Sequence, residues 1–353
     1  MTLLLNNDDV AQLLDIKTCV QVIEEAYQDM ARGEAVPCPT RTSIQVPLEG
    51  GVSYIHDSFK GASRRRGVLA IRMKSDIKGQ EMSHGTLRET KWASRPGKFC
   101  GLVLLFSTRN GELLAILNDG LIQHLRVGVT SAVGAKYMCR PDAATLGMLG
   151  SGGQANSHTR AFAAVLPLKK LKVYSPNPEH RKAFAEEMSR TLGLEAEAVD
   201  EPKAAVTGSD LVAVCTNANE PVLKGEWLEP GCHVSAIRSH YALPQDFFSY
   251  VDLVVKHQEQ NSSRSAVGSE EELRQAYVEE GTSRKRENIP TLEKLVSGQV
   301  VGRNSPEQIT FFENNAGNGM QFAVAGAVVY ERALERGLGR ELPTDWFLQD
   351  IRD

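Results

Sequence analysis

Residues Leu146–His158 read LGMLGSGGQANSH, and this stretch decides how the middle of the chain folds. It arranges Gly150, Gly152 and Ala155 in a G-x-G-x-x-A pattern. An apolar run, TLGMLG, precedes the glycines, a helical pattern extends to Leu166, and a second apolar run, LKVYS, follows at the spacing of a βαβ unit. We therefore expect a strand, a glycine turn, a helix and a second strand, in that order.

A glycine turn of this kind can do more than connect a strand to a helix. One glycine makes the tight turn, the next lets a pyrophosphate approach the backbone, and a small third residue lets the helix and strand pack closely. Such turns are common, so a plain connection is the alternative. The strand and helix context favours binding of a nicotinamide dinucleotide. The candidate contacts are Gly150, Gly152, Gly153, Gln154 and Ala155.

The end of the second strand bears on which dinucleotide binds. NAD-binding units usually place an acidic residue there to hold the ribose 2′-hydroxyl. Here the sequence is YSPNPEHR, and no acid directly follows Tyr174. Ser175 and Asn177 are neutral hydrogen-bonding residues, and Arg181 can meet a 2′-phosphate in a charge-assisted pair. We expect NADP(H), with NAD(H) as the alternative, and Asn177 can also cap the next helix.

The sequence changes character along its length. From Ser43 to Leu117, short apolar runs alternate with glycine-bearing turns, which is typical of an antiparallel sheet, and Asn110–Gly111 predicts a hairpin. From Ala143 onward, short buried-type strands alternate with helical stretches, which predicts βαβ units on a parallel sheet. A long amphipathic helix ends at Gly337. The predicted fold class is α/β, with a Rossmann-type dinucleotide-binding domain and a second α/β domain whose sheet is mainly antiparallel.

Composition argues against several classes of protein. The 353 residues carry a net charge of -4, which the short basic runs Arg64–Arg66 and Arg284–Arg286 do not outweigh, so we expect no nucleic-acid or membrane partner. The N-terminal MTLLLNNDDV lacks the features of a secretory signal, and no segment is apolar over a bilayer's thickness. The six scattered cysteines favour reduced thiols in a cytoplasm and no metal site.

A series of motifs in a fixed order runs nearly from end to end of the chain. Together they resemble the ornithine cyclodeaminase/mu-crystallin family, and the ordered series is far more specific than the glycine turn alone. The matching segments are PTR at Pro39–Arg41, AIRMKS around Lys74, GLVLLFSTRNGELLAILNDG, HLRVGVTSAVGAKYM around Arg126, LGSGGQA, TNANEPVL, PGCHVSAI, LEKLVSG and ITFFENNAGNGMQFAVAGAVVYERALERGLG.

The resemblance implies both an architecture and a reaction. Residues 1–142 plus 316–353 would form a domain that binds substrate and makes a homodimer, and residues 143–315 would form the NAD(P)-binding Rossmann-type domain. The shared chemistry of the family is hydride exchange between nicotinamide C4 and the α-carbon of a small amino or imino acid. Thr216 and Asn217, in TNANEPVL, would join the cofactor site.

Three basic residues carry over by motif to the substrate site. Arg41 and Arg126 would clamp the substrate carboxylate, because a guanidinium matches a carboxylate with two parallel hydrogen bonds. Lys74 would sit beside the reacting carbon and nitrogen, where burial near arginines can lower a lysine's pKa and suit it to proton transfer. The alternatives are a surface charge for Arg41, a structural salt bridge for Arg126 and a charged strand face for Lys74.

The chain also departs from the family pattern. Where the cyclodeaminases carry N-A-x-G-A-D, this sequence reads SAIRSH, with His240 at the aspartate position and Arg238 in place of a glycine. A neutral histidine can act as general acid or base, although His240 can also be a loop residue with no catalytic role. The cationic Arg238 disfavours a diamine substrate such as ornithine. Gln321 stands near where relatives often have an aspartate.

These features predict an NAD(P)(H)-dependent oxidoreductase that acts on a small imino or amino acid. It would be an imino-acid or ketimine reductase, or an amino-acid dehydrogenase in the reverse direction, with Lys74 and His240 as catalytic residues. One alternative is a lyase of the ornithine cyclodeaminase type that uses bound NAD within each turnover. The other is a non-catalytic, dimeric NADP(H)-binding protein.

Overall fold

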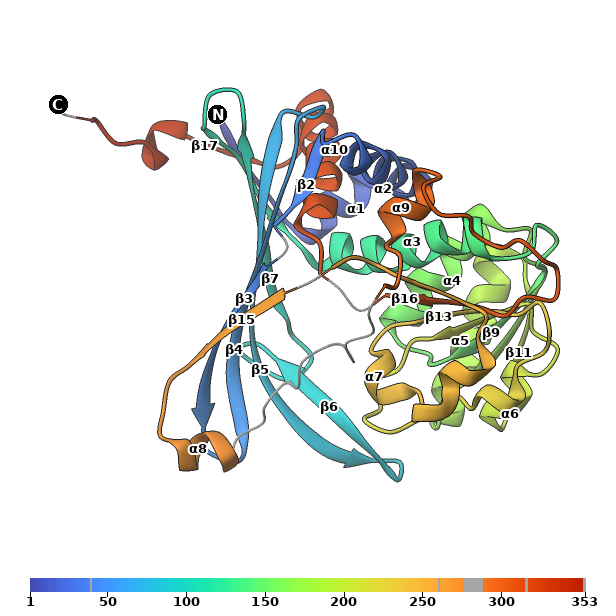
Figure 1. The fold of residues 1–353 in the computed structure, drawn as a ribbon. Coiled ribbons are helices and arrows are strands. Elements are labelled where there is room, and N and C mark those ends of the chain that lie inside the picture. The colour runs from blue at the N-terminus through green and yellow to red at the C-terminus, as the bar shows by residue number, and fades with distance from the viewer. Residues whose placement is uncertain (39, 260, 276–287, 315–316, 352–353) are drawn as a thin grey trace.

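The computed structural model describes residues 1–351 apart from 39, 260, 276–287 and 315–316, and it contains two sheets side by side (Figure 1). The strands of the larger sheet are β1 (Thr2–Leu5), β2 (Ala35–Pro37), β3 (Thr40–Leu48), β4 (Val52–Ser63), β5 (Val68–Ser83), β6 (Thr86–Trp92), β7 (Cys100–Ser107), β8 (Leu113–Asn118), β15 (Asn261–Ala266) and β17 (Arg340–Leu342). Their order is β15-β3-β4-β5-β7-β8-β1-β17, with β2 on β4 and β6 on β5. Most of these pairs are antiparallel.

The smaller sheet is parallel in every pair that joins its strands within the described residues. Its strands are β9 (Thr145–Leu149), β10 (Lys170–Tyr174), β11 (Glu195–Ala198), β12 (Leu211–Val214), β13 (His233–Ala236), β14 (Leu253–Lys256) and β16 (Thr310–Glu313). The order β11-β10-β9-β12-β13-β16-β14 runs one way from β9 to β11 and the other way from β12 onward. This reversal beside β9 is the switch point of a Rossmann-type sheet, where ligands bind. The predicted fold class is confirmed.

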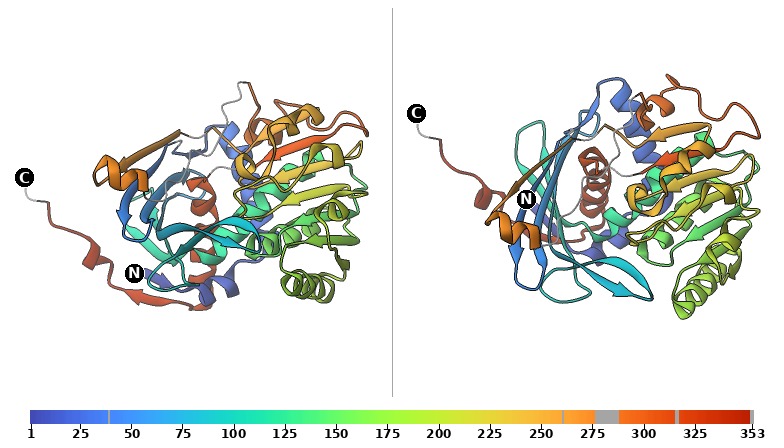
Figure 2. Two further views of the ribbon diagram at one scale, coloured as in Figure 1. Left: turned by 90° about the horizontal axis from the view of Figure 1, so that it is seen from below. Right: turned by 60° about the horizontal axis from the view of Figure 1, so that its bottom comes forward.

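Helices cover both faces of the smaller sheet and one face of the larger sheet (Figures 1 and 2). The helices are α1 (Asn7–Leu13), α2 (Ile16–Ala31), α3 (Gly120–Met138), α4 (Gly153–Val165), α5 (Pro178–Leu192), α6 (Pro202–Val206), α7 (Ser239–Ala242), α8 (Glu270–Gln275), α9 (Leu292–Val296) and α10 (Gly319–Arg336), with 3₁₀ turns at Gly225–Trp227, Gln245–Tyr250 and Thr344–Phe347. No helix in the described ranges is long and apolar enough to cross a bilayer.

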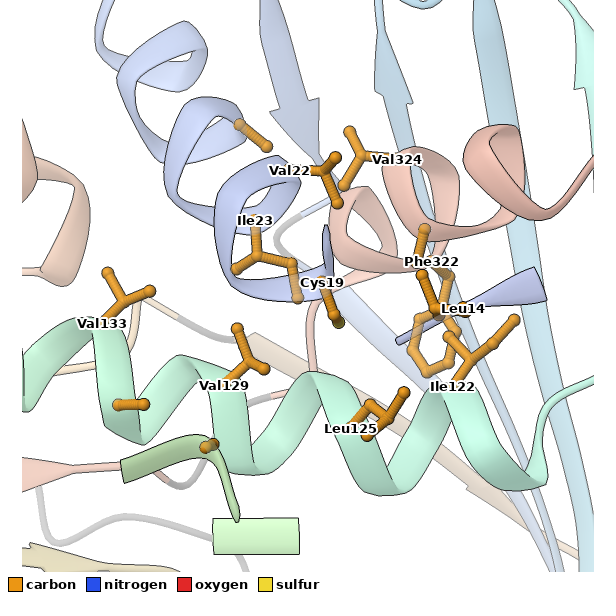
Figure 3. Packing of buried hydrophobic residues seen from close by; sticks show 14 of the residues in the cluster. Leu14, Cys19, Val22, Ile23, Ile122, Leu125, Val129, Val133, Phe322 and Val324 are labelled. Carbon is orange, nitrogen blue, oxygen red and sulfur yellow. The ribbon is translucent and has the colours of Figure 1, made fainter. Parts of the chain in front are cut away.

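Helix α3 joins the two sheets and is buried almost all round. On one side it packs against α2 and α10, where Ile23, Val129 and Phe322 belong to a single apolar cluster (Figure 3). On the other side it meets α4 so closely that a Cβ on Gly128 would lie 2.7 Å from the backbone of Ser157. Only glycine lets two helix backbones approach to this distance, so α3 fixes the position of the glycine turn relative to the larger sheet.

Strand β5 changes character halfway along its inward face. Val68 and Ala70 are buried in the apolar core, whereas Arg72, Lys74 and Asp76 follow at the same alternating positions. The apolar half lies beneath α10 and the charged half lies beside the smaller sheet (Figure 1). One strand therefore contributes to both the core and the candidate site.

Several predicted elements are present, and two segments depart from expectation. The Asn110–Gly111 hairpin joins β7 to β8, and the final helix ends at Gly337 in a left-handed cap. Strand β15 pairs parallel with β3 of the larger sheet, although it lies within the range 143–315 expected to form the Rossmann-type domain. Strand β16 inserts between β13 and β14 where the sequence pattern predicted no strand. The basic run at 284–286 and the expected boundary at 315/316 lie outside the described residues.

We expect Gly128→Ala to lower the free energy of unfolding by about 1–3 kcal/mol, because the new methyl group must push α3 away from α4. Urea denaturation followed by circular dichroism measures the loss. Lys136→Ala, an exposed change on the same helix, serves as the control and is expected to stay within about 0.5 kcal/mol of the parent. An unchanged midpoint for Gly128→Ala would contradict the close packing.

Candidate active site

A cleft of about 1670 Å³ lies between the two sheets, at the carboxyl ends of β9 and β12. It brings together most of the residues singled out from the sequence. Its lining includes Arg41, Lys74, Arg126, Gly150, Gly152, Gly153, Gln154, Ser175, Asn177, Thr216, Asn217 and His240. Ala155 and Arg181 are the candidates that do not line it. The cleft therefore joins predicted substrate residues of the larger sheet and of α3 to the predicted cofactor residues beside the smaller sheet.

The glycine turn has the shape that a pyrophosphate requires. Gly150 has a φ of 127°, and a side chain there would overlap the carbonyl of Cys215, which directly follows β12. Nothing lies within 4 Å of the position that a Cβ would take on Gly152, so that face is open to a ligand. No side chain caps the start of α4, which leaves its first backbone N–H groups for a bound anion. Ala155 is fully buried and serves the helix–strand packing.

Asn177 and Arg181, two predicted cofactor residues that follow β10, are placed differently in the structure. Asn177 caps α5 by accepting hydrogen bonds from the backbone of Glu179 and His180, and it also lines the cleft. Arg181 is buried, donates to the backbone oxygen of Ser175 at 3.0 Å and forms an ion pair with Asp200. In this structure Arg181 therefore holds the loop after β10 and does not line the cleft, although its sequence position suggested a 2′-phosphate ligand.

A fully buried carboxylate, Asp57 on β4, joins two of the predicted substrate residues. Arg41 donates to it from Nε at 2.9 Å and from Nη2 at 2.5 Å, which is a bidentate pair. Lys74 Nζ lies 2.6 Å from the same carboxylate and 3.4 Å from Asp76. The side chains of Arg41 and Lys74 are each 12% exposed, so both can meet a ligand in the cleft while Asp57 fixes their positions.

Sequence reasoning missed Asp57, although a signal was available. In the β4–β5 hairpin, Asp57 and Lys74 are directly opposite each other. The register that places Ser63 against Val68 across the Arg64–Gly67 turn also places these two residues together. An acid at an inward-facing position opposite a candidate lysine is a pair that hairpin counting can find.

Two further arginines lie deeper in the cleft. Arg72 is 3% exposed and its Nε donates to Asp119 at 2.6 Å. Arg126 is also buried, and both guanidinium groups lie within 5.6 Å of the Phe322 ring centre. Burial and the neighbouring charge of Arg72 lower the pKa of Arg126 to about 9. A bound carboxylate would stabilise the charged form, so this environment favours an anionic ligand.

The amides of half-buried Gln123 and buried Gln321 hold the Arg126 guanidinium in place. Gln123, one turn earlier on α3, accepts from Nη2 at 2.9 Å, and Gln321 of α10 accepts from Nη1 at 3.4 Å. The Gln321 amide nitrogen in turn donates to the hydroxyls of Tyr27 and Thr130. Gln321, the departure noted in the sequence, therefore ties Arg126 to both α2 and α10.

His158 is a structural histidine behind the glycine turn. Its Nδ1 lies 2.7 Å from the Gln154 carbonyl and its Nε2 lies 3.0 Å from the Ser131 hydroxyl. Burial lowers its pKa to about 4, so the ring is neutral near pH 7. It therefore links α4 to α3 and holds no proton for the reaction.

The segment after β13 places both departures from the family motif at the cleft. Arg238 adopts a left-handed conformation, with φ 55° and ψ 38°, which suits the glycine that it replaces. Its guanidinium donates to Asn219 at 2.6 Å and lies 4.8 Å from the ring centre of Tyr241. His240 is half-buried on α7 and lines the cleft, and its ring centre lies 4.1 Å from that of Tyr241 with the two rings tilted by 45°. Arg238 is thus held rigidly beside the candidate acid–base residue.

The β5–β6 hairpin crosses from the larger sheet to the smaller one, as the projecting β6 shows in Figures 1 and 2. The backbone of Asn219 donates to Leu87 at 3.0 Å, and the Asn217 side chain donates to the Glu89 carbonyl at 3.2 Å. Glu89 also lies 3.7 Å from Arg238. The hairpin therefore covers the loop that carries the predicted cofactor residue Asn217, a contact that sequence reasoning did not anticipate.

A Rossmann-type sheet joined to a mainly antiparallel sheet across a cationic cleft defines a dinucleotide-dependent oxidoreductase of the α/β class. The particular family then follows from the whole sequence. The chain belongs to the ornithine cyclodeaminase/mu-crystallin family, whose model matches residues 1–337. The resemblance inferred from the motifs is confirmed.

Individual members of the family are similar to this chain in sequence and in structure. The chain is 31% identical over 242 residues to a Delta(1)-pyrroline-2-carboxylate reductase of Bacillus cereus, which covers 69% of this chain and 74% of that protein. It is 35% identical over 135 residues to the ketimine reductase mu-crystallin of Rattus norvegicus, which covers 38% and 42%. The solved structure of Thermococcus litoralis Delta(1)-pyrroline-2-carboxylate reductase in complex with NADH and L-proline has a TM-score of 0.76 and 26% identity, covering 97% of this chain and 100% of that one.

We expect Asp57→Asn to lower kcat/KM by about 100-fold, because the neutral amide can no longer hold both Arg41 and Lys74 in position. Steady-state kinetics with an imino acid and reduced nicotinamide cofactor measure the loss, and circular dichroism checks that the variant is folded. Glu331→Gln, which breaks an exposed ion pair with Arg66, is the control and should retain full activity. Parent-like kinetics for Asp57→Asn would show that the shared carboxylate has no part in the site.

Proposed function

We infer that the protein is an NAD(P)(H)-dependent oxidoreductase that transfers hydride to or from the α-carbon of a small imino or amino acid. The observation that carries this inference is the placement of Arg41, Lys74 and Arg126 in one cleft with the glycine turn. The relatives that are imino-acid and ketimine reductases support the reducing direction. Bound at the glycine turn, a nicotinamide dinucleotide supplies or accepts hydride at C4.

Cationic residues of β3 and α3 orient the substrate. Arg41 and Arg126 bind its carboxylate, and because Asp57 and the amides of Gln123 and Gln321 already fix both guanidinium groups, little side-chain freedom is lost on binding. This clamp presents one face of the α-carbon toward the smaller sheet, whose glycine turn forms the opposite wall of the cleft. Bringing two reactants into the correct relative orientation accounts for a large part of the activation free energy of a bimolecular reaction.

Lys74 is the proton donor or acceptor for the substrate nitrogen. Its Nζ is held by Asp57 and Asp76, so it can donate a proton to an imine as the α-carbon is reduced, or take one from an amine in reverse. His240 is the auxiliary acid or base at the other wall of the cleft, beside Arg238. The cation at Arg238 makes a neutral or acidic substrate side chain more favourable there than a second amine.

The cofactor preference that we propose is NADP(H), with NAD(H) as the alternative. At the carboxyl end of β10 and the start of α5, the described residues that line the cleft are Tyr174, Ser175, Pro176, Asn177 and His180, and none of these is acidic. A 2′-phosphate there meets no carboxylate from this segment, whereas the 2′-hydroxyl of NAD lacks the acidic partner that usually holds it.

We expect purified protein to oxidise NADPH, and NADH less efficiently, in the presence of cyclic imino acids or of oxo-acid and amine pairs. Lys74→Ala should lower kcat by at least about 100-fold while NADPH binding, followed by its fluorescence, is retained. Lys60→Ala, an exposed lysine on the neighbouring strand, is the matched control.

The same assay separates the alternatives. If no substrate in the panel causes nicotinamide oxidation, the reductase proposal fails. Ammonia release from ornithine without net change in nicotinamide absorbance would indicate the cyclodeaminase-type lyase instead. Full biological activity in Lys74→Ala, with cofactor binding intact, would indicate a non-catalytic binding protein.

We also propose that the protein is a homodimer located in the cytoplasm. Helices α2, α3 and α10 and the smaller sheet lie on one side of the larger sheet (Figures 1 and 2). The strands β5, β7 and β8 place apolar side chains on the opposite face. On β7, Val103 and Leu105 point into the core, whereas Leu102 is 38% exposed and Leu104 is half-buried. An apolar sheet face of this extent suits a second sheet. The six cysteines all lie in the described residues and are free, which fits a reducing compartment.

We expect Leu104→Glu to convert the dimer to monomer, since a carboxylate at the centre of an apolar sheet interface cannot be solvated. Sedimentation velocity gives the mass. Val301→Glu changes an apolar residue that is 72% exposed in the loop after α9, and it should leave the dimer intact. A Leu104→Glu variant that sediments as the parent dimer does would exclude this face as the interface.

A further inference from the structure

The last residues of the chain form an arm that leaves the body of the protein. Strand β17 pairs antiparallel with β1 at the edge of the larger sheet, and the Thr344 hydroxyl still lies 3.4 Å from that of Thr2. Beyond Thr344, the backbone hydrogen bonds within the described residues are internal to the arm, from Trp346 to Pro343 and from Leu348 to Asp345. The arm lies beyond residue 337, where the match to the family model ends.

Apolar side chains are concentrated on this arm. Trp346 is 71% exposed, Phe347 41%, Leu348 55% and Ile351 90%. The 3₁₀ turn Thr344–Phe347 orders the first of them, so the arm presents a shaped apolar surface and not a polar tail. Monomeric proteins rarely leave such clustered apolar surface in water, and exposed clusters usually mark a contact site.

The direction of the arm identifies its partner. In Figures 1 and 2 the arm extends from β17 on the side of the larger sheet opposite the helices. That side is also the apolar face of β5, β7 and β8 on which we place the second copy. The arm points away from its own sheet, and its anchor, β17, is a strand of the same sheet. The arm and the proposed interface are therefore continuous.

We propose that the arm, residues Pro343–Ile351, docks on a second copy of this chain and clamps the two larger sheets together. The inference rests on the homodimer put forward above. In a two-fold symmetric dimer each arm contacts the other copy, so every contact made by an arm side chain occurs twice per dimer. Tryptophan is the side chain most enriched at the energetic centre of interfaces, and Trp346 is the anchor of this contact.

The test compares three full-length proteins: the parent, Trp346→Ser/Leu348→Ser, and Val301→Ser, the last being an exposed apolar control on the smaller-sheet side. Sedimentation over a dilution series gives the dimer dissociation constant. We expect the arm variant to raise it by at least tenfold and the Val301 variant to leave it unchanged. Equal constants for the parent and the arm variant would overturn the proposal.

Hydrogen exchange adds a readout that folding defects do not mimic. Amides of residues 345–351 should be protected above the dissociation constant and exchange freely below it. Protection that persists in the monomer would mean that the arm folds onto its own sheet, and a protein that is monomeric at every concentration would remove the partner; either outcome overturns the proposal. Sedimentation and hydrogen exchange do not depend on the reductase assay. If the protein shows no reductase activity but protection of the arm changes with protein concentration, the docking proposal still holds.

Discussion

The buried carboxylate of Asp57 is the interaction on which the site depends. Removing a charge from water costs several kcal/mol per ion unless partners and hydrogen bonds compensate for it. Asp57 supplies that compensation for Arg41 and Lys74 together, from the strand that lies between theirs. Without it two cations would face each other across β4. The pairing of Asp57 with Lys74 is therefore a consequence of strand register, which the β4–β5 hairpin turn sets.

Each of the arginines Arg41, Arg72 and Arg126 at the cleft is held by a polar partner. Asp57 and Asp119 each hold an arginine of the larger sheet in a short ion pair, and amide oxygens orient Arg126 between α3 and α10. Oriented guanidinium groups bind a carboxylate with little reorganisation. Because Arg126 is bound by side chains from two different helices, its position reports how those helices pack. Core packing and carboxylate recognition are thus connected through one residue.

Local sequence patterns predicted the parts of the structure that local forces determine. The strand, glycine turn and helix around Gly150 and the hairpin at Asn110–Gly111 depend on backbone preferences within a few residues, and both are present. Strand β15 could not be anticipated, because its pairing with β3 joins segments more than two hundred residues apart. The contacts of Arg181 could not be anticipated for a related reason. Its spacing fits a phosphate ligand, but in the structure it pairs with Asp200, which the motif does not contain.

The departures from the family motif become interpretable only in three dimensions. Arg238 replaces a glycine and keeps the left-handed conformation, and its guanidinium meets Asn219 and Glu89. Glu89 comes from the β5–β6 hairpin of the other sheet. The replacement is thus part of a contact between the two sheets as well as a change of charge in the cleft. A comparison of sequence motifs reveals only the change of charge and not the contact between the sheets.

Strand β5 shows why the site and the outer face of the larger sheet cannot vary independently. Its inward residues pass from the apolar core to the charged cleft, while Ile71 and Met73, on the opposite face, are half-buried. Side chains alternate along a strand, so a change in twist that improves packing on the outer face also moves Arg72 and Lys74 on the inner face. Contacts made on the outer face therefore restrict the curvature that the inner face can adopt. The positions of Lys74 and its arginine neighbours follow from that curvature as directly as from their own hydrogen bonds.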